Sequence, residues 1–172
     1  MEVYIKSVIN QWGSYKSNAE KTFVQLTDDQ LFWQANEESN SIATIVKHMH
    51  GNMLSRWTDF LVSDGEKAWR KRDDEFENDL TTRAGIMQLW EEGWACAINA
   101  IKDLKDADLD REIWIRGESH SVLDAIQRQL AHYPYHIGQI VFLGKLQVGN
   151  KWDSLSIPKG KSKEFNEKMK KK

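Results

Sequence analysis

The stretch Ala131-His-Tyr-Pro-Tyr-His-Ile-Gly-Gln-Ile140 places two histidines, His132 and His136, four residues apart. Residues four apart lie one turn above each other on one face of a helix, so the two imidazoles can close on a single metal ion. A third candidate is His48, near the start of another predicted helix. Three neutral nitrogens without a fourth protein ligand leave a metal open to water or substrate. The pattern therefore favours a reactive site over a structural one.

The composition is that of an ordinary globular protein. The 172 residues fit one domain, with 40% hydrophobic and 29% charged side chains. Lys and Arg number 24 against 26 for Asp and Glu, a formal charge of −2 that argues against a nucleic-acid partner. No N-terminal signal and no run of about 20 apolar residues is present, so we expect a cytoplasmic protein without a membrane partner.

Cysteine and tryptophan usage points to packing. The only cysteine, Cys96, cannot form an internal disulfide, and its small and apolar neighbours predict a buried filler rather than a nucleophile. Eight tryptophans are present, and we expect most to pack in the core, with some lining a pocket or a dimer seam. Five of them fall on or beside predicted helices: Trp33, Trp57, Trp69, Trp90 and Trp94.

Apolar residues recur with a helical period in four long stretches. A short turn capped by Thr27 or Asp28 separates the first two, and the charged segment 63–79 after the second is typical of a long surface loop. The predicted helices are about 2–26, Ser39 or Ser41 to about 63, Thr81 or Thr82 to 104, and Ser121 to about 147.

Two short alternating runs in 109–122 flank Gly117-Glu118 and predict a small β-hairpin before the last helix. Residues 159–172 are rich in lysine and predict a solvated, flexible tail after a domain that covers residues 1–158. Four helices with one long crossover predict an all-α fold, a four-helix bundle.

The histidines allow more than one interpretation. His50 lies two residues from His48, so both cannot easily bind one ion, and the spacing of their neighbours does not decide between them. A polar stripe on an apolar helix is costly to bury without a partner, which a metal would supply. Alternatively, His132 and His136 satisfy each other through water or carbonyl groups, or face solvent. Pro134 between them predicts a kink or a local bend around the core.

Four segments together resemble the DinB/YfiT-like superfamily, most closely its branch of small bacterial proteins without an assigned activity. The likeness spans nearly the whole chain and extends to Trp152–Pro158. The segments that carry it are Asn40-Ser-Ile-Ala-Thr-Ile-Val-Lys-His-Met-His-Gly-Asn52, Asp64-Gly-Glu-Lys-Ala-Trp-Arg-Lys-Arg-Asp73, Ile115-Arg-Gly-Glu-Ser-His-Ser-Val-Leu-Asp-Ala-Ile126 and His132-Tyr-Pro-Tyr-His-Ile-Gly-Gln-Ile-Val141.

This resemblance implies an up-down-down-up four-helix bundle, a homodimer, and a metal site built from three histidines. The ligand from the second helix is the histidine of the Ser-Ile-Ala-x4-His pattern, which is His48, and the other two are His132 and His136. The metal is expected to be divalent, with zinc favoured and nickel next, because imidazole suits several such ions.

Relatives in the superfamily include bacillithiol S-transferases and mycothiol-dependent isomerases of maleylpyruvate. The resemblance therefore implies a metal-dependent enzyme that transfers a low-molecular-weight thiol such as bacillithiol to an electrophile. Asn52 lies one turn from His48 and Gln139 nearly one turn from His136, where either can orient a bound cofactor or a metal ligand. Otherwise both are amides on a helix surface.

Two other function classes stay open. A metal-dependent hydrolase needs a general base, and no carboxylate or further histidine lies at helical spacing from the ligands, although Glu118 or His120 could reach the site if the hairpin folds over it. A noncatalytic dimeric metal-binding scaffold or stress protein is the third class, and a closed site with four ligands would favour it.

Overall fold

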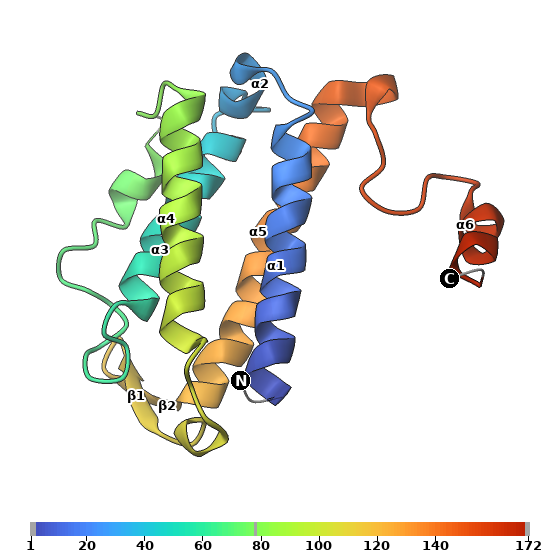
Figure 1. The fold of residues 1–172 in the computed structure, drawn as a ribbon. Helices are drawn as coiled ribbons and strands as arrows, with labels where there is room; N and C mark the ends of the chain where they lie inside the picture. The colour runs from blue at the N-terminus through green and yellow to red at the C-terminus, as the bar shows by residue number, and fades with distance from the viewer. Residues whose placement is uncertain (1–2, 78, 171–172) are drawn as a thin grey trace.

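The computed structural model describes residues 3–77 and 79–170, and these are mainly helical with one antiparallel hairpin (Figure 1). Three short 3-10 turns, Asp73–Phe76, Asp106–Asp108 and Gly149–Lys151, join the longer elements. The α-helices are α1 (Val3–Phe23), α2 (Asp28–Phe32), α3 (Ile42–Trp57), α4 (Arg83–Ile101), α5 (Val122–Val148) and α6 (Ser162–Met169), and the strands are β1 (Glu112–Ile115) and β2 (Glu118–Ser121).

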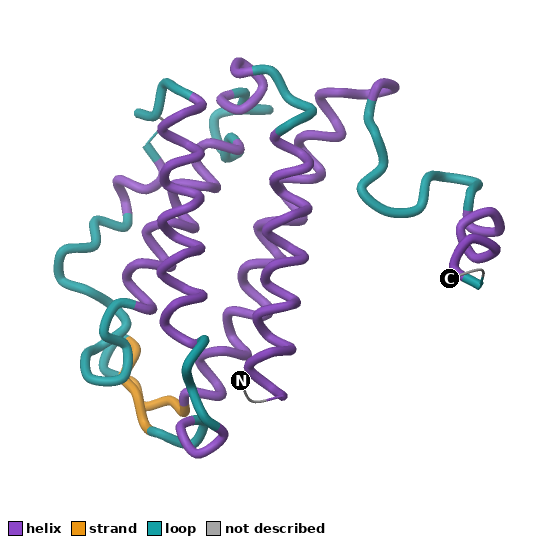
Figure 2. The backbone as a smooth tube through the Cα atoms, in the orientation of Figure 1, coloured by secondary structure: helices purple, strands orange, loops and turns teal. Residues whose placement is uncertain are grey.

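The four long helices lie side by side (Figures 1 and 2). In Figure 1, α1 and α5 run in one direction, and α3 and α4 run in the other. The most extensive contacts join α3 to α4 and α1 to α5, and α3 also contacts α5. Helices α3 and α5, which carry the candidate histidines, are therefore antiparallel neighbours.

Side-chain caps decide where the long helices begin. Ser41 rather than Ser39 caps α3, accepting a hydrogen bond of 3.0 Å from the backbone N–H of Thr44. The hydroxyl of Thr82 caps α4, and that of Ser121 caps α5 as predicted. Each hydroxyl satisfies an amide that has no partner within its helix.

The second helix ends six residues earlier than predicted, at Trp57 instead of about residue 63. Thr58 is extended and Asp59 adopts a positive φ of 48°, which no helix tolerates. The apolar pattern continues past this point because Phe60 folds back onto Trp57, with ring centroids 5.1 Å apart. The apolar periodicity beyond Trp57 therefore indicated which residues are buried, and it did not indicate that the helix continues.

The hairpin is confirmed, but its turn is Arg116-Gly117 and not Gly117-Glu118, because Glu118 already pairs with Ile115. Both turn residues have positive φ, 56° and 74°, as a two-residue turn of type I′ requires. The Asp64 carboxylate accepts hydrogen bonds from the backbone N–H groups of both, at 2.9 and 2.8 Å. This contact fixes the hairpin against the loop that follows α3.

A layer of fully buried aromatic rings takes one side chain from each long helix. Trp12 of α1 lies 5.7 Å from Trp57 of α3, 6.3 Å from Trp94 of α4 and 5.4 Å from Tyr133 of α5, measured between ring centroids. The indole N–H of Trp57 donates to the hydroxyl of Tyr133 at 2.7 Å. The layer sets the rotation of α5, and with it the direction of the adjacent His132.

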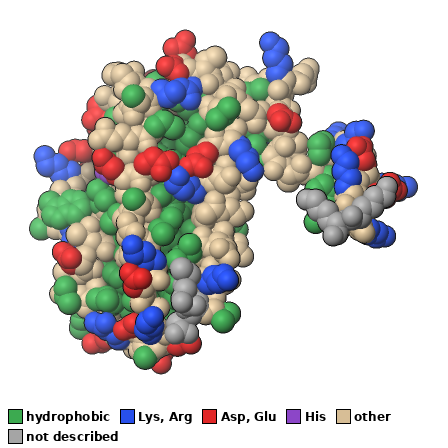
Figure 3. Space-filling view, viewed as in Figure 1, with side chains coloured by type: hydrophobic (Ala, Val, Ile, Leu, Met, Phe, Trp, Pro, Cys, Tyr) green, Lys and Arg blue, Asp and Glu red, His purple; other side chains and the backbone are tan. Residues whose placement is uncertain are grey.

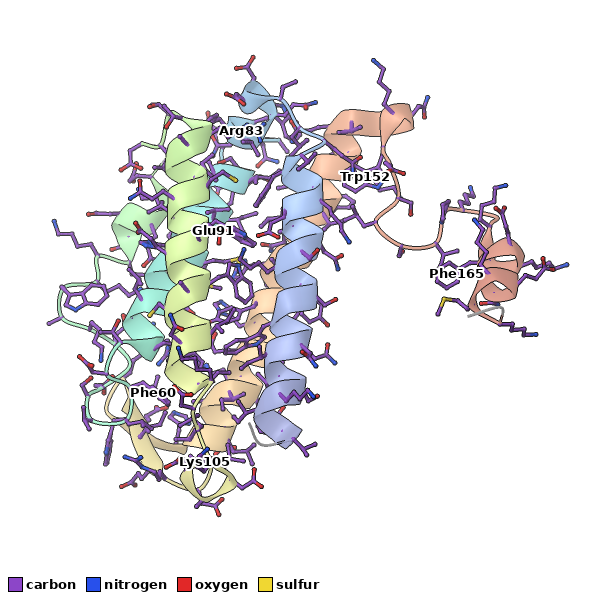
Figure 4. All side chains as sticks on the ribbon, in the orientation of Figure 1. Phe60, Arg83, Glu91, Lys105, Trp152 and Phe165 are labelled. Carbon is purple, nitrogen blue, oxygen red and sulfur yellow. The ribbon has the colours of Figure 1, made fainter. Side chains whose placement is uncertain are left out.

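The expectation for the tryptophans holds in part. Trp57, Trp90 and Trp94 are buried, whereas Trp33 and Trp69 are exposed. Polar contacts join α4 to its neighbours as well: Arg83, labelled in Figure 4, donates to the backbone carbonyl oxygens of Phe23 and Leu26 at the end of α1. Both kinds of contact hold α4 in place.

The lysine-rich C-terminal segment contains a helix that the sequence analysis did not predict. Every residue of α6 is exposed, and Figures 1 and 2 show it apart from the long helices.

Acidic and basic side chains alternate over the face of α4 and α1 that Figure 3 shows, with no patch of one sign there. Among the described residues, no helix has the length and apolar character that crossing a bilayer requires.

Replacing Tyr133 with Phe should lower the free energy of unfolding by about 1–3 kcal/mol, because the buried indole N–H of Trp57 loses its acceptor. The matched control is Tyr135→Phe at an exposed neighbour, which should change stability by no more than about 0.5 kcal/mol. Urea denaturation followed by circular dichroism measures both. Equal stability of the Tyr133→Phe variant and the wild type would contradict the role given to this hydrogen bond.

Candidate metal centre

Three histidines from two helices converge on one point. His48 of α3 meets His132 and His136 of α5, and one ring nitrogen from each lies within 4.8 Å of the others. His48 is 6% exposed, and the other two are half-buried. His50 turns away towards α4, where its Nε2 lies 3.4 Å from a carboxylate oxygen of Glu92. The cluster therefore contains His48 and not His50.

The two α5 histidines are each held by a glutamine three residues away. Nδ1 of His132 lies 3.1 Å from Oε1 of Gln129, and Nδ1 of His136 lies 3.0 Å from Oε1 of Gln139. An amide oxygen only accepts hydrogen bonds, so both Nδ1 atoms carry the proton. Each ring is thereby fixed in the tautomer whose Nε2 bears a free lone pair.

Those two lone pairs point at each other, because the Nε2 atoms of His132 and His136 are 3.1 Å apart. Burial and the neighbouring positive groups hold the pKa of His132 down to about 3, and burial also lowers the pKa of His136. Both rings are therefore neutral at pH 7, and neither nitrogen has a proton to donate to the other. Two converging neutral imidazoles fit the ligand set of a divalent transition metal.

His48 is oriented by a carboxylate from the charged loop. Its Nδ1 donates to Oε2 of Glu75 at 3.0 Å, and its ring stacks on Phe76 with the centroids 5.1 Å apart. Arg70 binds both oxygens of Glu75, at 2.7 and 2.9 Å. Burial alone raises the pKa of Glu75, but the hydrogen bonds from Arg70 and His48 outweigh it and lower that pKa. An ionised Glu75 thus fixes the tautomer of His48.

The prediction that residues 63–79 form a surface loop is wrong for Glu75, which is buried. This carboxylate is only 5% exposed and belongs to the 3-10 turn Asp73–Phe76, which packs on α3. Gly51, one turn after His48, makes the contact possible: a Cβ there would lie 2.2 Å from Oε1 of Glu75. A glycine within a helix lowers its stability, so its presence here is explained by the room that Glu75 needs.

A cavity of about 350 Å³ opens beside the histidine cluster between α3, α5 and the loops. Asn52 faces it, and its side-chain oxygen is buried without a hydrogen-bond partner among the described residues. Gln139 does not line this cavity and contacts His136 from behind. The lining is His48, Asn52, Arg56, Arg70, Arg72, Phe76, Arg116, Arg128, Gln129, His132, Tyr135 and His136.

The hairpin residue that reaches the cavity is neither of the two that the sequence suggested. Arg116 lines it, whereas Glu118 and His120 do not, and these two lie 3.9 Å from each other. Cys96 also lies away from it. Its sulfur is half-buried near the carbonyl oxygen of Met53, and burial raises the pKa of its thiol. The predicted role of Cys96 as packing filler agrees with this environment.

Helical spacing paired His132 with His136, and the family resemblance selected His48 over His50, but neither indicated Glu75 or Arg70. Nothing in the charged run Arg70-Lys-Arg-Asp-Asp-Glu75 distinguishes a buried carboxylate from an exposed one. The available signals were weak: the loop directly follows the helix of His48, and the helix contains Gly51. Gln129 lies three residues before His132, so helical spacing was a signal for its contact with that ring.

Replacing Gly51 with Ala should displace Glu75 and weaken metal binding by about 10–100-fold, the usual effect of losing a group that orients a ligand. Competition with a chromophoric chelator measures the affinity. The control is Gly13→Ala in α1, where a Cβ meets nothing within 4 Å. That variant should keep its metal affinity and gain about 0.5–1 kcal/mol of stability from helix propensity. Equal metal affinities in the two variants would contradict the role of Glu75.

Comparison with known proteins gives a family and no activity. No curated protein and no solved structure matches the chain significantly. The sequence profile of one family, described as a protein of unknown function (DUF1572), matches residues 1–161. This match covers both histidine-bearing helices and the loop with Glu75, and it ends before α6. The chain therefore belongs to the DUF1572 family.

Proposed function

We propose that this protein binds one divalent metal through His48, His132 and His136 and acts as a metal-dependent thiol S-transferase. The observation that carries the proposal is the convergence of three histidine rings. In each ring, Nδ1 is held by an oxygen acceptor. Among the described residues, no fourth histidine, cysteine or carboxylate joins the cluster, and a cavity adjoins it. Three ligands and an open side are typical of catalytic rather than structural sites.

We further infer that the four long helices form the up-down-down-up bundle of the DinB-like proteins. The opposite directions of the α1/α5 and α3/α4 pairs support this arrangement, as does the aromatic layer that takes one ring from each helix (Figure 1). The location of the histidines on α3 and α5 is what the resemblance leads us to expect.

A bound divalent cation with an open position supplies a Lewis acid that lowers the pKa of a thiol or of water. The chain's own residues then orient the reactants. Asn52 presents a buried amide to the cavity, where its oxygen can accept a hydrogen bond from a bound thiol cofactor. Gln139 acts at one remove, by holding Nδ1 of His136. In the transfer, the thiol sulfur bonds to an electrophilic carbon, the leaving group departs with its electron pair, and the thiol proton passes to solvent.

The two alternatives have less support. Hydrolysis needs a free general base, and the carboxylate that contacts the cluster, Glu75, has both oxygens occupied by Arg70 and His48. A noncatalytic dimeric scaffold does not require the cavity or the partnerless oxygen of Asn52. Zinc is the favoured metal and nickel the next, because neutral imidazoles bind both. A cytoplasmic location stays a prediction.

Elemental analysis of protein purified without a nickel column tests the metal site. Wild-type protein should contain about one equivalent of zinc or nickel, and His132→Ala and His136→Ala should each contain little, since three-ligand sites do not tolerate the loss of a ligand. The matched control is His120→Ala, a histidine outside the cluster, which should keep the metal. Wild-type protein that takes up no metal after addition of zinc or nickel would refute the proposed function.

Metal-loaded protein should then accelerate bacillithiol transfer to a chlorodinitrobenzene electrophile, followed by the absorbance of the thioether product. Cys96→Ala should keep this activity, because that thiol lies outside the cavity. Metal binding without activity towards any thiol would favour the scaffold instead.

The homodimer that the resemblance implies also stays a prediction. Three large apolar side chains are exposed on one face of α5, namely Tyr135 (64%), Phe142 (66%) and Leu146 (55%), and they suit a second copy. Light scattering after size exclusion should give twice the 20.0 kDa chain mass. Phe142→Glu should give a monomer, whereas Val62→Glu, at an even more exposed apolar side chain outside α5, should not. A wild-type mass of one chain would exclude the dimer.

A further inference from the structure

The cavity has two chemically different ends. On α3, His48, Asn52 and Arg56 occur at every fourth residue and all line it. On α5, the same spacing joins Arg128, His132 and His136. Helices α3 and α5 run in opposite directions (Figure 1). The histidines therefore lie at one end of the cavity, and Arg56 and Arg128 lie at the other.

Arg56 is a buried cation that forms no ion pair with a described residue, although the carboxylate of Glu66 lies near enough to favour its charge. Its residue is 4% exposed, and its Nε and Nη1 atoms are buried with no hydrogen-bond partner among the described residues. Burial and the nearby Arg128 lower the pKa of Arg56, yet a guanidinium stays protonated in proteins. An unpaired buried charge is costly in free energy, so its persistence beside a cavity points to a ligand that pairs with it.

The other arginines around the cavity increase this positive charge. Arg72 and Arg128 are exposed at its edge and form no ion pair with a described residue, whereas Arg70 is neutralised by Glu75. Arg116 pairs with Glu66, at 3.1 Å between Nε and Oε2. Three carboxylates, Glu66, Glu75 and Asp64, thus stand near five guanidinium groups, and Asp64 is engaged with backbone N–H groups.

Arginine clusters with this composition bind oxyanions, because the planar guanidinium donates two parallel hydrogen bonds to a carboxylate or phosphate. The helical rise places Arg56 about 12 Å from His48 along α3, and Arg128 about 6 Å from His132 along α5. A small molecule can therefore place its reacting atom at the histidine end while an anionic group lies among the arginines.

We propose that the substrate of this site is a small organic anion, and that Arg56 and Arg128 bind its carboxylate or phosphate group at the end of the cavity away from the histidines. This inference rests on the proposed function, since it takes the histidine end as the place of reaction. Arg56 binds the anion from the buried side, and Arg128 binds it from the exposed edge of the cavity. The role of both is in binding and positioning.

The experiment measures anion binding to metal-free protein prepared with a chelator, so that no metal contributes. Malonate and inorganic phosphate represent the two anion classes, and malonamide is the neutral analogue of malonate. Calorimetric titration at low salt should detect binding of malonate or phosphate, or both, to the wild type and none of malonamide; the anion that binds more tightly identifies the class. Bound anion should also raise the melting temperature.

Two variants and a control locate the site. Arg128→Gln changes an exposed residue and should weaken anion binding by about tenfold, the loss expected for one charge-assisted pair. Arg56→Met should abolish binding and melt at a higher temperature than the ligand-free wild type, because an uncompensated buried charge is removed. Arg111→Gln removes an exposed arginine outside the cavity and should bind as the wild type does.

Several results would overturn the proposal. These are wild-type protein that binds neither anion, unchanged affinity in Arg128→Gln, or binding that occurs only in metal-loaded protein and ignores both arginine substitutions. A lower melting temperature of Arg56→Met would assign Arg56 a structural role instead; if that variant fails to fold, Arg128→Gln alone decides. None of these outcomes alters the metal content of the wild type or of His132→Ala, so failure of the anion site and failure of the metal site are distinguishable.

Discussion

The hydrogen bond between Trp57 and Tyr133 connects the core of this protein to its candidate site. The bond is made inside the aromatic layer, where α3 and α5 each contribute one buried ring. Because Tyr133 points into that layer, the residues on either side of it, His132 and Pro134, have fixed directions on α5. His132 and His136 consequently face α3, where His48 completes the cluster. Rotation of either helix by one residue would separate these nitrogens.

Around the cluster, a buried carboxylate and a buried guanidinium differ in whether the chain pairs their charge. Near His48, the carboxylate of Glu75 is fully compensated by Arg70, so its charge serves to hold a ring nitrogen in one tautomer. At the other end of the cavity, Arg56 is buried with no such partner in the part of the chain that the structure describes. The charge of Glu75 is therefore paired within the chain, whereas the proposed partner of Arg56 is the anionic group of a ligand. This contrast separates the group that supports the histidines from the group that binds.

Local sequence features were sufficient for most of the helices. The hydroxyls at Thr82 and Ser121 and the apolar periodicity act over a few residues, so their consequences are visible in the chain itself. The hairpin was visible in the same way, although its turn lies one residue earlier than predicted. Errors occurred where a long-range contact overrode the local pattern. Phe60 continues the apolar period but packs back on Trp57 after the helix has ended. The helix α6 has no buried side, so its pattern resembled a solvated tail.

The sequence by itself determined the helical class, the hairpin and the pairing of His132 with His136, since a four-residue spacing on one helix leaves no freedom of placement. Residue spacing left His48 and His50 open, and the resemblance favoured His48. Only the tertiary structure shows that His48 meets the pair, that Glu75 leaves the surface, and that Arg56 is buried with no hydrogen-bond partner for its Nε and Nη1 among the described residues. The reason is physical. Which face of α3 is covered, and where a loop without periodicity folds, depend on contacts between segments far apart in the chain.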